Sequence, residues 1–218
     1  PKGMIFLGGS VANFQKGFAN ISVPSVLATL VSDKLDFPNL SMVGVDDRAA
    51  AYQAVSYLIQ QGHRKIAVLG GPATSHPSMM RRQGAQQAME DAGIRFEDKL
   101  YGLSNYDFES AYHAMNGLLA RRAEFTALFA MSDVIAFGAI RALVSAGLRV
   151  PEDVSVIGFD GITMSRYCVP VMTTIVQPSE QIALQSIELL VRQIEHGTPA
   201  QTVTLQPELQ QGESVRAL

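Results

Sequence analysis

The stretch "GLRVPEDVSVIGFD", which runs from Gly147 to Asp160, contains the pattern that decides the fold. Gly147 suits the left-handed residue that closes a helix, and Pro151 cannot continue a helix. The residues from Val154 to Ile157 form a short apolar run, as expected of a strand that is buried on both faces. The stretch therefore predicts a helix end, a turn and a buried strand, with the carboxylate of Asp160 at the carboxyl end of that strand.

Strand patterns alternate with helix patterns along the rest of the chain. Apolar runs predict strands at 3–7, 40–45, 65–69, 100–103, 127–130, 154–157, 173–176 and 202–205. Apolar residues at helical spacing, together with capping residues and closing glycines, predict helices at 47–61, 78–92, 108–119, 133–146 and 179–196. The polar, glycine-rich stretch 8–20 shows no clear period. Repeated strand–helix units with short turns imply an α/β fold with a parallel sheet covered by helices on both faces.

Composition excludes several classes of protein. The chain has 218 residues, a net charge of −3 and 47% apolar residues, which is enough to bury a sizeable core. The sequence pI of about 5.8 gives no general attraction to nucleic acid or acidic membranes. The single cysteine, Cys168, excludes an internal disulfide and fits a reducing compartment. No apolar run reaches the length of a membrane span, so we expect a cytoplasmic protein.

The motifs that carry chemistry in enzymes are missing. The Gly70–Pro72 segment follows a strand but lacks the spacing of the dinucleotide and P-loop motifs, and a tight turn explains it better. The four histidines are scattered and form no H-E-x-x-H pair. Cys168 stands in no local nucleophile signature, and the sequence contains no G-x-S-x-G. We therefore expect no metal, no cofactor and no enzymatic activity.

Several polar side chains stand where α/β sheets bind ligands, outside the carboxyl ends of the strands. Asp160 offers two acceptors for hydroxyl groups, Arg81 offers a planar set of donors, and Tyr106 offers a ring face for stacking. An ordinary role is also open for each: a turn residue, a solvated helix start and simple packing. Ser132 suits a helix cap equally well. Together these residues predict a binding site for a small polar ligand, because no general acid is paired with a base.

Several linked segments resemble the effector-binding domain of the LacI/GalR family of bacterial transcription regulators. They are the stretch quoted above, "GHRKIAVLGGP" (62–72), "MRRQGAQQAMEDAGI" (80–94), "FTALFAMSDVIAFGAIRAL" (125–143) and "VPVMTTIVQP" (169–178). The segments occur in the family's order and spacing, and the resemblance is densest from Val43 to Pro178.

The resemblance implies a two-lobed, periplasmic-binding-protein-like (type I) fold with parallel sheets flanked by helices. The N-terminal lobe would comprise 1–45 plus 179–196 and would be incomplete. The C-terminal lobe would comprise 47–174 plus 202–218. The ligand would lie in a cleft between the lobes and change the angle between them.

The resemblance also sets expectations about partners. Family members begin with a helix-turn-helix headpiece, which this sequence lacks, so operator DNA would be bound only through that absent headpiece. Two half-sites on an operator call for a two-fold symmetric reader, so we expect a homodimer. The nearest stretches for contact with the partner are Met42–Val45 and the helix at Ala49–Tyr57.

The family's ligand contacts match individual positions of this sequence. Asp160 matches an aspartate that binds hydroxyl groups or a ring, and Arg81 matches an arginine that contacts the effector. Tyr106 falls where an aromatic residue often stacks, and Ser132 where Asn or Gly is frequent. The other side of the cleft would come from residues near Leu7 to Ser10, from Thr29 (where an Asp often stands) and from Ser179, beside a position that is aromatic in some sugar-binding members.

The predicted function is the effector-binding and dimerisation domain of a LacI-type repressor. Its ligand would be a sugar or a sugar phosphate, with a purine as the alternative. The alternative function is a periplasmic sugar-binding protein of a transport system. A helix-turn-helix encoded upstream would indicate the repressor, and a signal peptide would indicate transport.

Overall fold

The chain folds into two compact units, each built from separate segments. The computed structural model describes residues 1–8 and 10–218, so Gly9 lies outside the described residues. The first unit comprises 1–46, 75–77 and 178–207. The second unit comprises 47–74, 78–177 and 208–218. Among the described residues, no helix is both long and apolar enough to cross a membrane.

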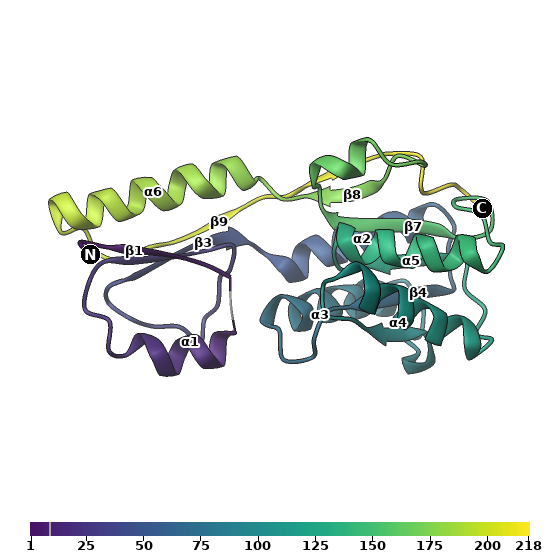
Figure 1. Cartoon of the computed structure of the whole chain (residues 1–218), viewed down its shortest axis with the longest axis horizontal. Helices are drawn as coiled ribbons and strands as arrows, with labels where there is room; N and C mark the ends of the chain where they lie inside the picture. The colour runs from purple at the N-terminus through teal and green to yellow at the C-terminus, as the bar shows by residue number, and fades with distance from the viewer. Residues whose placement is uncertain (9) are drawn as a thin grey trace. The chain divides into compact units, whose positions relative to one another are not determined.

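The first unit is a four-stranded parallel sheet with one helix on each face (Figure 1). Its strands, in spatial order, are β1 (Met4–Leu7), β2 (Ser25–Ala28), β3 (Leu40–Val45) and β9 (Thr202–Leu205). Side chains alternate between the two faces of the sheet. Leu27 and Met42 pack in the cluster of helix α1 (Val11–Phe18), whereas Val26 and Val43 pack in the cluster of helix α6 (Ser179–His196).

Helix α1 and strand β9 of the first unit differ from the sequence-based expectation. No helix is predicted in 8–20, yet α1 forms there, because Phe14 and Phe18 pack on one another and on Phe6 of β1, with ring centroids 5.0–6.0 Å apart. The strand 202–205 was expected in the C-terminal lobe, but β9 pairs with β3 in the first unit. The chain crosses to the second unit only after this strand.

The second unit is a six-stranded sheet with helices on both faces. The strands, in spatial order, are β10 (Glu208–Gln210), β8 (Thr173–Val176), β7 (Ser155–Asp160), β6 (Ala127–Ala130), β4 (Ile66–Gly70) and β5 (Tyr101–Leu103). β10 is antiparallel to β8, and the other pairs are parallel.

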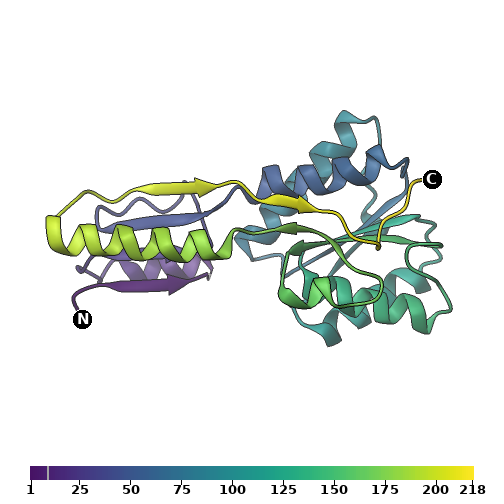
Figure 2. The ribbon, with the colours of Figure 1, turned by 90° about the horizontal axis from the view of Figure 1, so that it is seen from above.

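The helices of the second unit form the outer layers. They are α2 (Asp47–Gln60), α3 (His76–Asp91), α4 (Phe108–Ala120) and α5 (Asp133–Ser145), with short 3₁₀ turns at Asp98–Leu100 and Thr163–Arg166. Figure 2 shows α2 and α3 on one face of this sheet and α4 and α5 on the other. The core between the layers is largely aliphatic.

The strand order of the second unit determines where a ligand can bind. The chain passes from β4 outward to β5 and then returns to the other side of β4 to form β6. In doubly wound sheets such a reversal opens a crevice at the carboxyl ends of the two strands. The loops after β4, β6 and β7 therefore position the site.

The two stretches that were expected to contact a partner subunit contribute most of their apolar side chains to the cores of the two units. All six residues of β3 are buried, because it is an inner strand of the first unit. The apolar face of α2, including Ala51, Ala54 and Val55, packs in the core of the second unit. Their buried apolar side chains are used within the chain, and contact of either stretch with a partner subunit stays a prediction.

Candidate functional site

Arg81 lies at the centre of the predicted site and is held on several sides. It comes from α3, and its side chain is 6% exposed. Its Nε donates to Asp47 Oδ1 at 2.7 Å, and its Nη1 donates to the backbone oxygen of Met131. The guanidinium carbon lies 3.7 Å from the centre of the Phe159 ring, and Nη1 lies 3.8 Å from Asp160 Oδ1. The cation is therefore fixed beside the predicted ligand carboxylate.

The charges around Arg81 leave the site with an excess of negative charge. Burial lowers the pKa of Arg81, but the charges of Asp47 and Asp160 outweigh burial and raise it, so the guanidinium stays charged. Burial raises the pKa of Asp160, while Arg81 and a hydrogen bond from Gln177 oppose that rise. Two carboxylates thus share one cation, which favours a ligand that donates hydroxyl protons over one that brings further negative charge.

Asp160 stands at the end of β7 in an unusual backbone conformation. Its φ is 110°, a region that non-glycine residues rarely adopt. Gln177, directly after β8, donates its backbone N–H to the Asp160 carbonyl at 3.0 Å and its side-chain Nε2 to Oδ1 at 2.7 Å. The carboxylate is 28% exposed, so part of it is open to a ligand.

Backbone strain coincides with the predicted ligand residues. Among the described non-glycine residues, Thr29, Tyr106, Arg122 and Asp160 have positive φ values of 69°, 60°, 51° and 110°. Three of these four were predicted as ligand contacts. Each such conformation costs of the order of 1–3 kcal/mol and tends to occur at functional sites. The strain therefore supports these positions independently of their side-chain chemistry.

Tyr106 follows β5 and packs against the turn after β4. Its Oη lies 2.6 Å from Ser78 Oγ on α3. A Cβ atom at Gly71 would overlap the Tyr106 ring, so glycine is needed for this close approach. The Gly70–Pro72 segment is thus a tight turn that admits an aromatic ring. The Tyr106 ring therefore has a packing role within the second unit, and its stacking on a ligand stays a prediction.

Ser132 caps α5, as one of its two predicted roles required. Its Oγ accepts a hydrogen bond from the Ile135 N–H at 3.1 Å, and the residue is buried. Its hydroxyl proton is still available as a donor, so contact with a ligand stays a prediction. Asp133, the next residue, is fully buried and accepts hydrogen bonds from Thr174 and Ile162. Burial raises the pKa of Asp133 to about 6.

The remaining predicted contacts lie together in the first unit. Thr29 follows β2, and Ser179 is the first residue of α6, with Pro178 at the N-cap position. Both line a largely apolar hollow of about 230 Å³ that Leu7 also lines. The expected segment from Leu7 to Ser10 includes Gly9, which lies outside the described residues.

The sequence did not predict a role in the ligand site for four residues that contact or adjoin Arg81 and Asp160. Asp47 holds Arg81, and Phe159 supplies the ring beneath the guanidinium. Gln177 holds Asp160, and Asp133 lies behind it. Asp47 and Gln177 each come within two residues of the end of a strand. Inspection of every strand end for polar residues would therefore have found both.

Two other kinds of site were tested against the described residues. No group of three or more His, Cys, Asp or Glu side chains in the described part of the chain is arranged to hold a metal ion. Cys168 is half-buried, and burial raises the pKa of its thiol. A raised pKa disfavours the reactive thiolate.

Comparison with known proteins places this geometry in a family. Residues 55–215 match the periplasmic binding protein-like domain. The chain is 37% identical over 215 residues to the HTH-type transcriptional regulator MalR of Clostridium butyricum, which covers 98% of this chain and 64% of MalR. The transcriptional regulator CelR–cellobiose complex has a TM-score of 0.89 at 30% identity, covering 98% of this chain and 65% of CelR.

A LacI-family sugar-binding transcriptional regulator from Escherichia coli, solved in complex with phosphate, has a TM-score of 0.84 at 29% identity and covers 100% of this chain and 78% of its own. These relatives are transcription regulators and not enzymes. This chain spans 64% of the length of MalR. The chain belongs to the family of periplasmic binding protein-like domains, and the relatives it resembles are LacI-type transcriptional regulators.

Proposed function

We propose that this chain is the ligand-sensing part of a cytoplasmic LacI-type repressor, in which a small polar effector alters the binding of operator DNA. The observation that carries the proposal is the Arg81–Asp160 pair, fixed at 3.8 Å beside the switch point of the sheet. Among the described residues, no group of three or more His, Cys, Asp or Glu side chains is arranged to hold a metal ion. The two compact units would correspond to the two lobes of the family's domain.

The ligand that fits the second unit best is a neutral sugar. Asp160 would accept hydrogen bonds from hydroxyl groups through its partly exposed carboxylate, and Ser132 and Tyr106 would add polar and ring contacts. Arg81 would be the natural partner of a phosphate, but its Nε and Nη1 donate to Asp47 and Met131. A phosphorylated ligand would also approach the negative charges of Asp47 and Asp160. The cellobiose held by CelR is a neutral sugar.

A thermal-shift screen of the full-length protein tests the proposal. The panel is cellobiose, glucose, ribose and adenosine, with glucose 6-phosphate, ribose 5-phosphate and adenosine monophosphate as matched anions. We expect at least one neutral sugar to raise the Tm and its phosphorylated counterpart to raise it less. A phosphorylated member that raises the Tm more than its neutral partner would contradict the ligand class. The absence of any shift across the panel would contradict a sugar effector.

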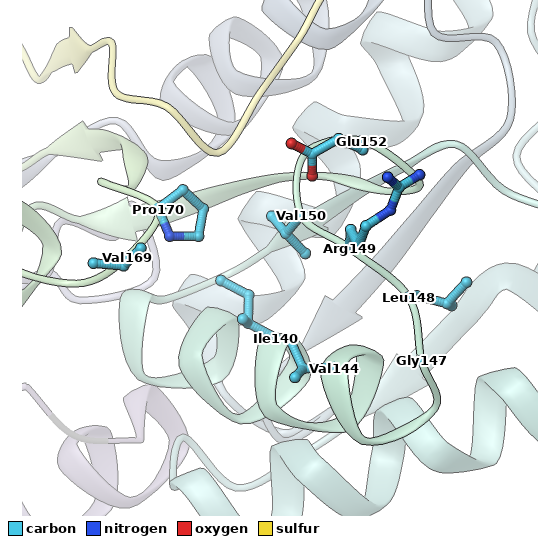
Figure 3. Close-up of a pocket in the computed structure, with 9 residues that line it drawn as sticks. All are labelled: Ile140, Val144, Gly147, Leu148, Arg149, Val150, Glu152, Val169 and Pro170. Carbon is cyan, nitrogen blue, oxygen red and sulfur yellow. The ribbon is translucent and has the colours of Figure 1, made fainter.

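We also propose that the regulator is a homodimer, as LacI-family regulators typically are, and that the partner binds an apolar surface of the second unit. A hollow of about 420 Å³ lies between α5 and two loops, and Figure 3 shows the side chains that line it. It is lined by Ile140, Val144, Gly147, Leu148, Arg149, Val150, Glu152, Val169 and Pro170. Val169 is 93% exposed and Tyr167, on the same loop, is 81% exposed. Exposed apolar surface of this kind marks a site of protein association.

A further inference from the structure

The turn that follows Asp160 is held in a conformation that its own sequence does not favour. Asp160 and Gly161 are consecutive residues with φ values of 110° and 70°. A Cβ atom at residue 161 would overlap Val176, so the turn lies tightly against β8. This turn sets the direction of the Asp160 carboxylate. A contact from outside the turn is needed to hold it, because the conformation is strained.

Gln177 holds Asp160 itself, and the Asp133 carboxylate supplies a second contact on the far side of the turn. One oxygen, Oδ2, accepts the backbone N–H of Ile162 at 2.9 Å, which is the residue after the turn. The other, Oδ1, accepts the hydroxyl of Thr174 on β8 at 2.6 Å. A Cβ atom at Gly158 of β7 would overlap Asp133 Oδ1. The turn after β7 and strand β8 therefore donate hydrogen bonds to the Asp133 carboxylate, and Gly158 of β7 leaves room for it.

This arrangement costs stability. Asp133 is 0% exposed, and a buried carboxylate is unfavourable unless its partners compensate for lost hydration. Burial raises its pKa, the bonds from Thr174 and Ile162 oppose the rise, and the charge of Asp160 adds to it. A buried charge that costs stability is often retained for function.

We propose that Asp133 is a positioning residue of the ligand site: it holds the turn after Asp160 so that the Asp160 carboxylate stays beside Arg81. The assignment deepens the proposed function, since it rests on Asp160 as a ligand contact. Asp133 itself lies behind the site and touches no part of the exposed surface. The negative charge of Asp133 matters because a charged acceptor binds an N–H more strongly than a neutral one.

The charged and titratable groups near Asp133 come from each element packed around it. Asp160 on β7 and the thiol of Cys168 interact with it electrostatically. Arg81 on α3 lies beyond Asp160, and Asp47 on α2 lies beyond Arg81. Protonation of Asp133 removes its charge and weakens the bond from Ile162. The turn should therefore loosen as the pH falls through about 6.

Amide hydrogen exchange measured by NMR on this chain tests the inference without any ligand. In the wild type at pH 7.5 we expect protection of the Ile162 amide, and at least a tenfold loss of protection in Asp133→Ala. The conservative variant Asp133→Asn should restore part of the protection, because its amide oxygen still accepts. In the wild type, the protection of the Ile162 amide should decrease as the pH is lowered through about 6. In Asp133→Asn it should stay constant over the same pH range.

Asp153→Ala is the matched control. Asp153 also accepts a backbone N–H, that of Arg149 at 2.8 Å, but lies in the turn before β7. Its substitution should lower protection at Arg149 and leave Ile162 unchanged. If Asp133→Ala does not fold, protection of the Ile162 amide is measured instead in Thr174→Val and, as a function of pH, in Asp133→Asn. Ile162 protection that is equal in the wild type and every Asp133 variant, and does not vary with pH, overturns the inference.

A second arm connects the turn to binding. The neutral sugar with the largest Tm shift in the panel is titrated into Asp133→Asn and into Asp153→Ala. We expect weaker binding by several-fold in the first variant and unchanged binding in the second. Equal affinities overturn a positioning role. If no sugar binds the wild type, the proposed ligand class fails, and the exchange experiment still decides whether Asp133 holds the turn.

Discussion

At the scale of single residues, the site depends on charges that are buried and paired. Arg81 and Asp47 are 6% and 7% exposed, so neither has water to replace its partner. Removal of one member of a buried pair leaves an uncompensated charge, which is strongly destabilising. The exposed ion pairs of this chain, such as Arg82 with Asp98, have no such role, because solvent screens them.

The Asp47–Arg81 pair leads to a first prediction. Asp47→Ala should lower the free energy of unfolding by about 3 kcal/mol, since it leaves the Arg81 guanidinium buried without its main counter-charge. Asp98→Ala, which breaks the exposed pair with Arg82, should leave stability nearly unchanged. Urea denaturation of both variants measures the difference. Equal stabilities for the two variants would show that the buried pair is unimportant.

A second prediction concerns the pH dependence of stability. The pKa of Asp133 is about 6 in the folded protein and ordinarily 3.8. Because the folded pKa is the higher one, its stabilising contribution is complete below about pH 4 and is lost as the pH rises through 6. The loss corresponds to about 3 kcal/mol. Asp133→Asn lacks this titration, so its stability relative to the wild type should rise between pH 4 and pH 7.5. A constant difference in urea denaturation across that range would contradict the buried charge.

At the scale of helices and strands, some elements follow from the local sequence pattern, whereas others depend on tertiary contacts. Apart from β10, the strands and helices of the second unit were predictable, because apolar runs alternate with helical spacing and end at glycines such as Gly147. Helix α1 was not, since its stability comes from contacts of Phe14 and Phe18 with Phe6. The place of β9 was not predictable either, because nothing in 202–205 specifies β3 as its neighbour.

The site shows the same division. The positions of Asp160, Arg81 and Ser132 at strand ends and helix starts were predictable from the sequence, whereas their contact with a ligand stays a prediction. The residues that pair with these side chains across the fold were not predictable from the sequence. Asp47 lies 34 positions from Arg81, and Thr174 lies 41 positions from Asp133. Such pairs form only when the sheet is assembled, so a local sequence pattern cannot predict them.

A third prediction separates two glycines by their surroundings. Gly158 of β7 faces Asp133, so Gly158→Ala should destabilise the protein and displace the carboxylate. Gly117 of α4 has nothing within 4 Å of an added Cβ atom. Gly117→Ala should therefore stabilise the protein by about 0.5–1 kcal/mol through helix propensity. Thermal unfolding of the two variants gives the comparison, and a destabilising Gly117→Ala or a neutral Gly158→Ala would conflict with the packing described.

At the scale of the whole molecule, the polar site adjoins the places where the chain leaves the second unit. Asp47 is the first residue of that unit, and Gln177 is the last before the chain enters the other. Between them the contacts run from Asp47 to Arg81, from Arg81 to Asp160 and from Asp160 to Gln177. A ligand bound to Asp160, as proposed, would act on residues that border two of the connecting segments.

A fourth prediction concerns assembly. Val169→Asp places a charge on the apolar surface around the hollow in Figure 3, and it should convert a dimer of the full-length protein to a monomer. Leu103→Asp, at an exposed apolar residue at the end of β5, should leave the dimer intact. Sedimentation velocity at micromolar concentration distinguishes the two. A Val169→Asp protein that stays dimeric would exclude this surface as the interface.

Calorimetric titration of the full-length Asp160→Asn protein with the neutral sugar selected by the panel tests the central claim most directly. The substitution keeps the shape of the side chain and removes its charge. The loss of a charged hydrogen-bond partner costs about 1.5–3 kcal/mol of binding, which is about a ten- to hundredfold weaker affinity. We predict that loss together with an unchanged or higher urea midpoint, since burial already raises the pKa of Asp160. An affinity equal to that of the wild type would contradict the assignment of Asp160 as the ligand-binding carboxylate.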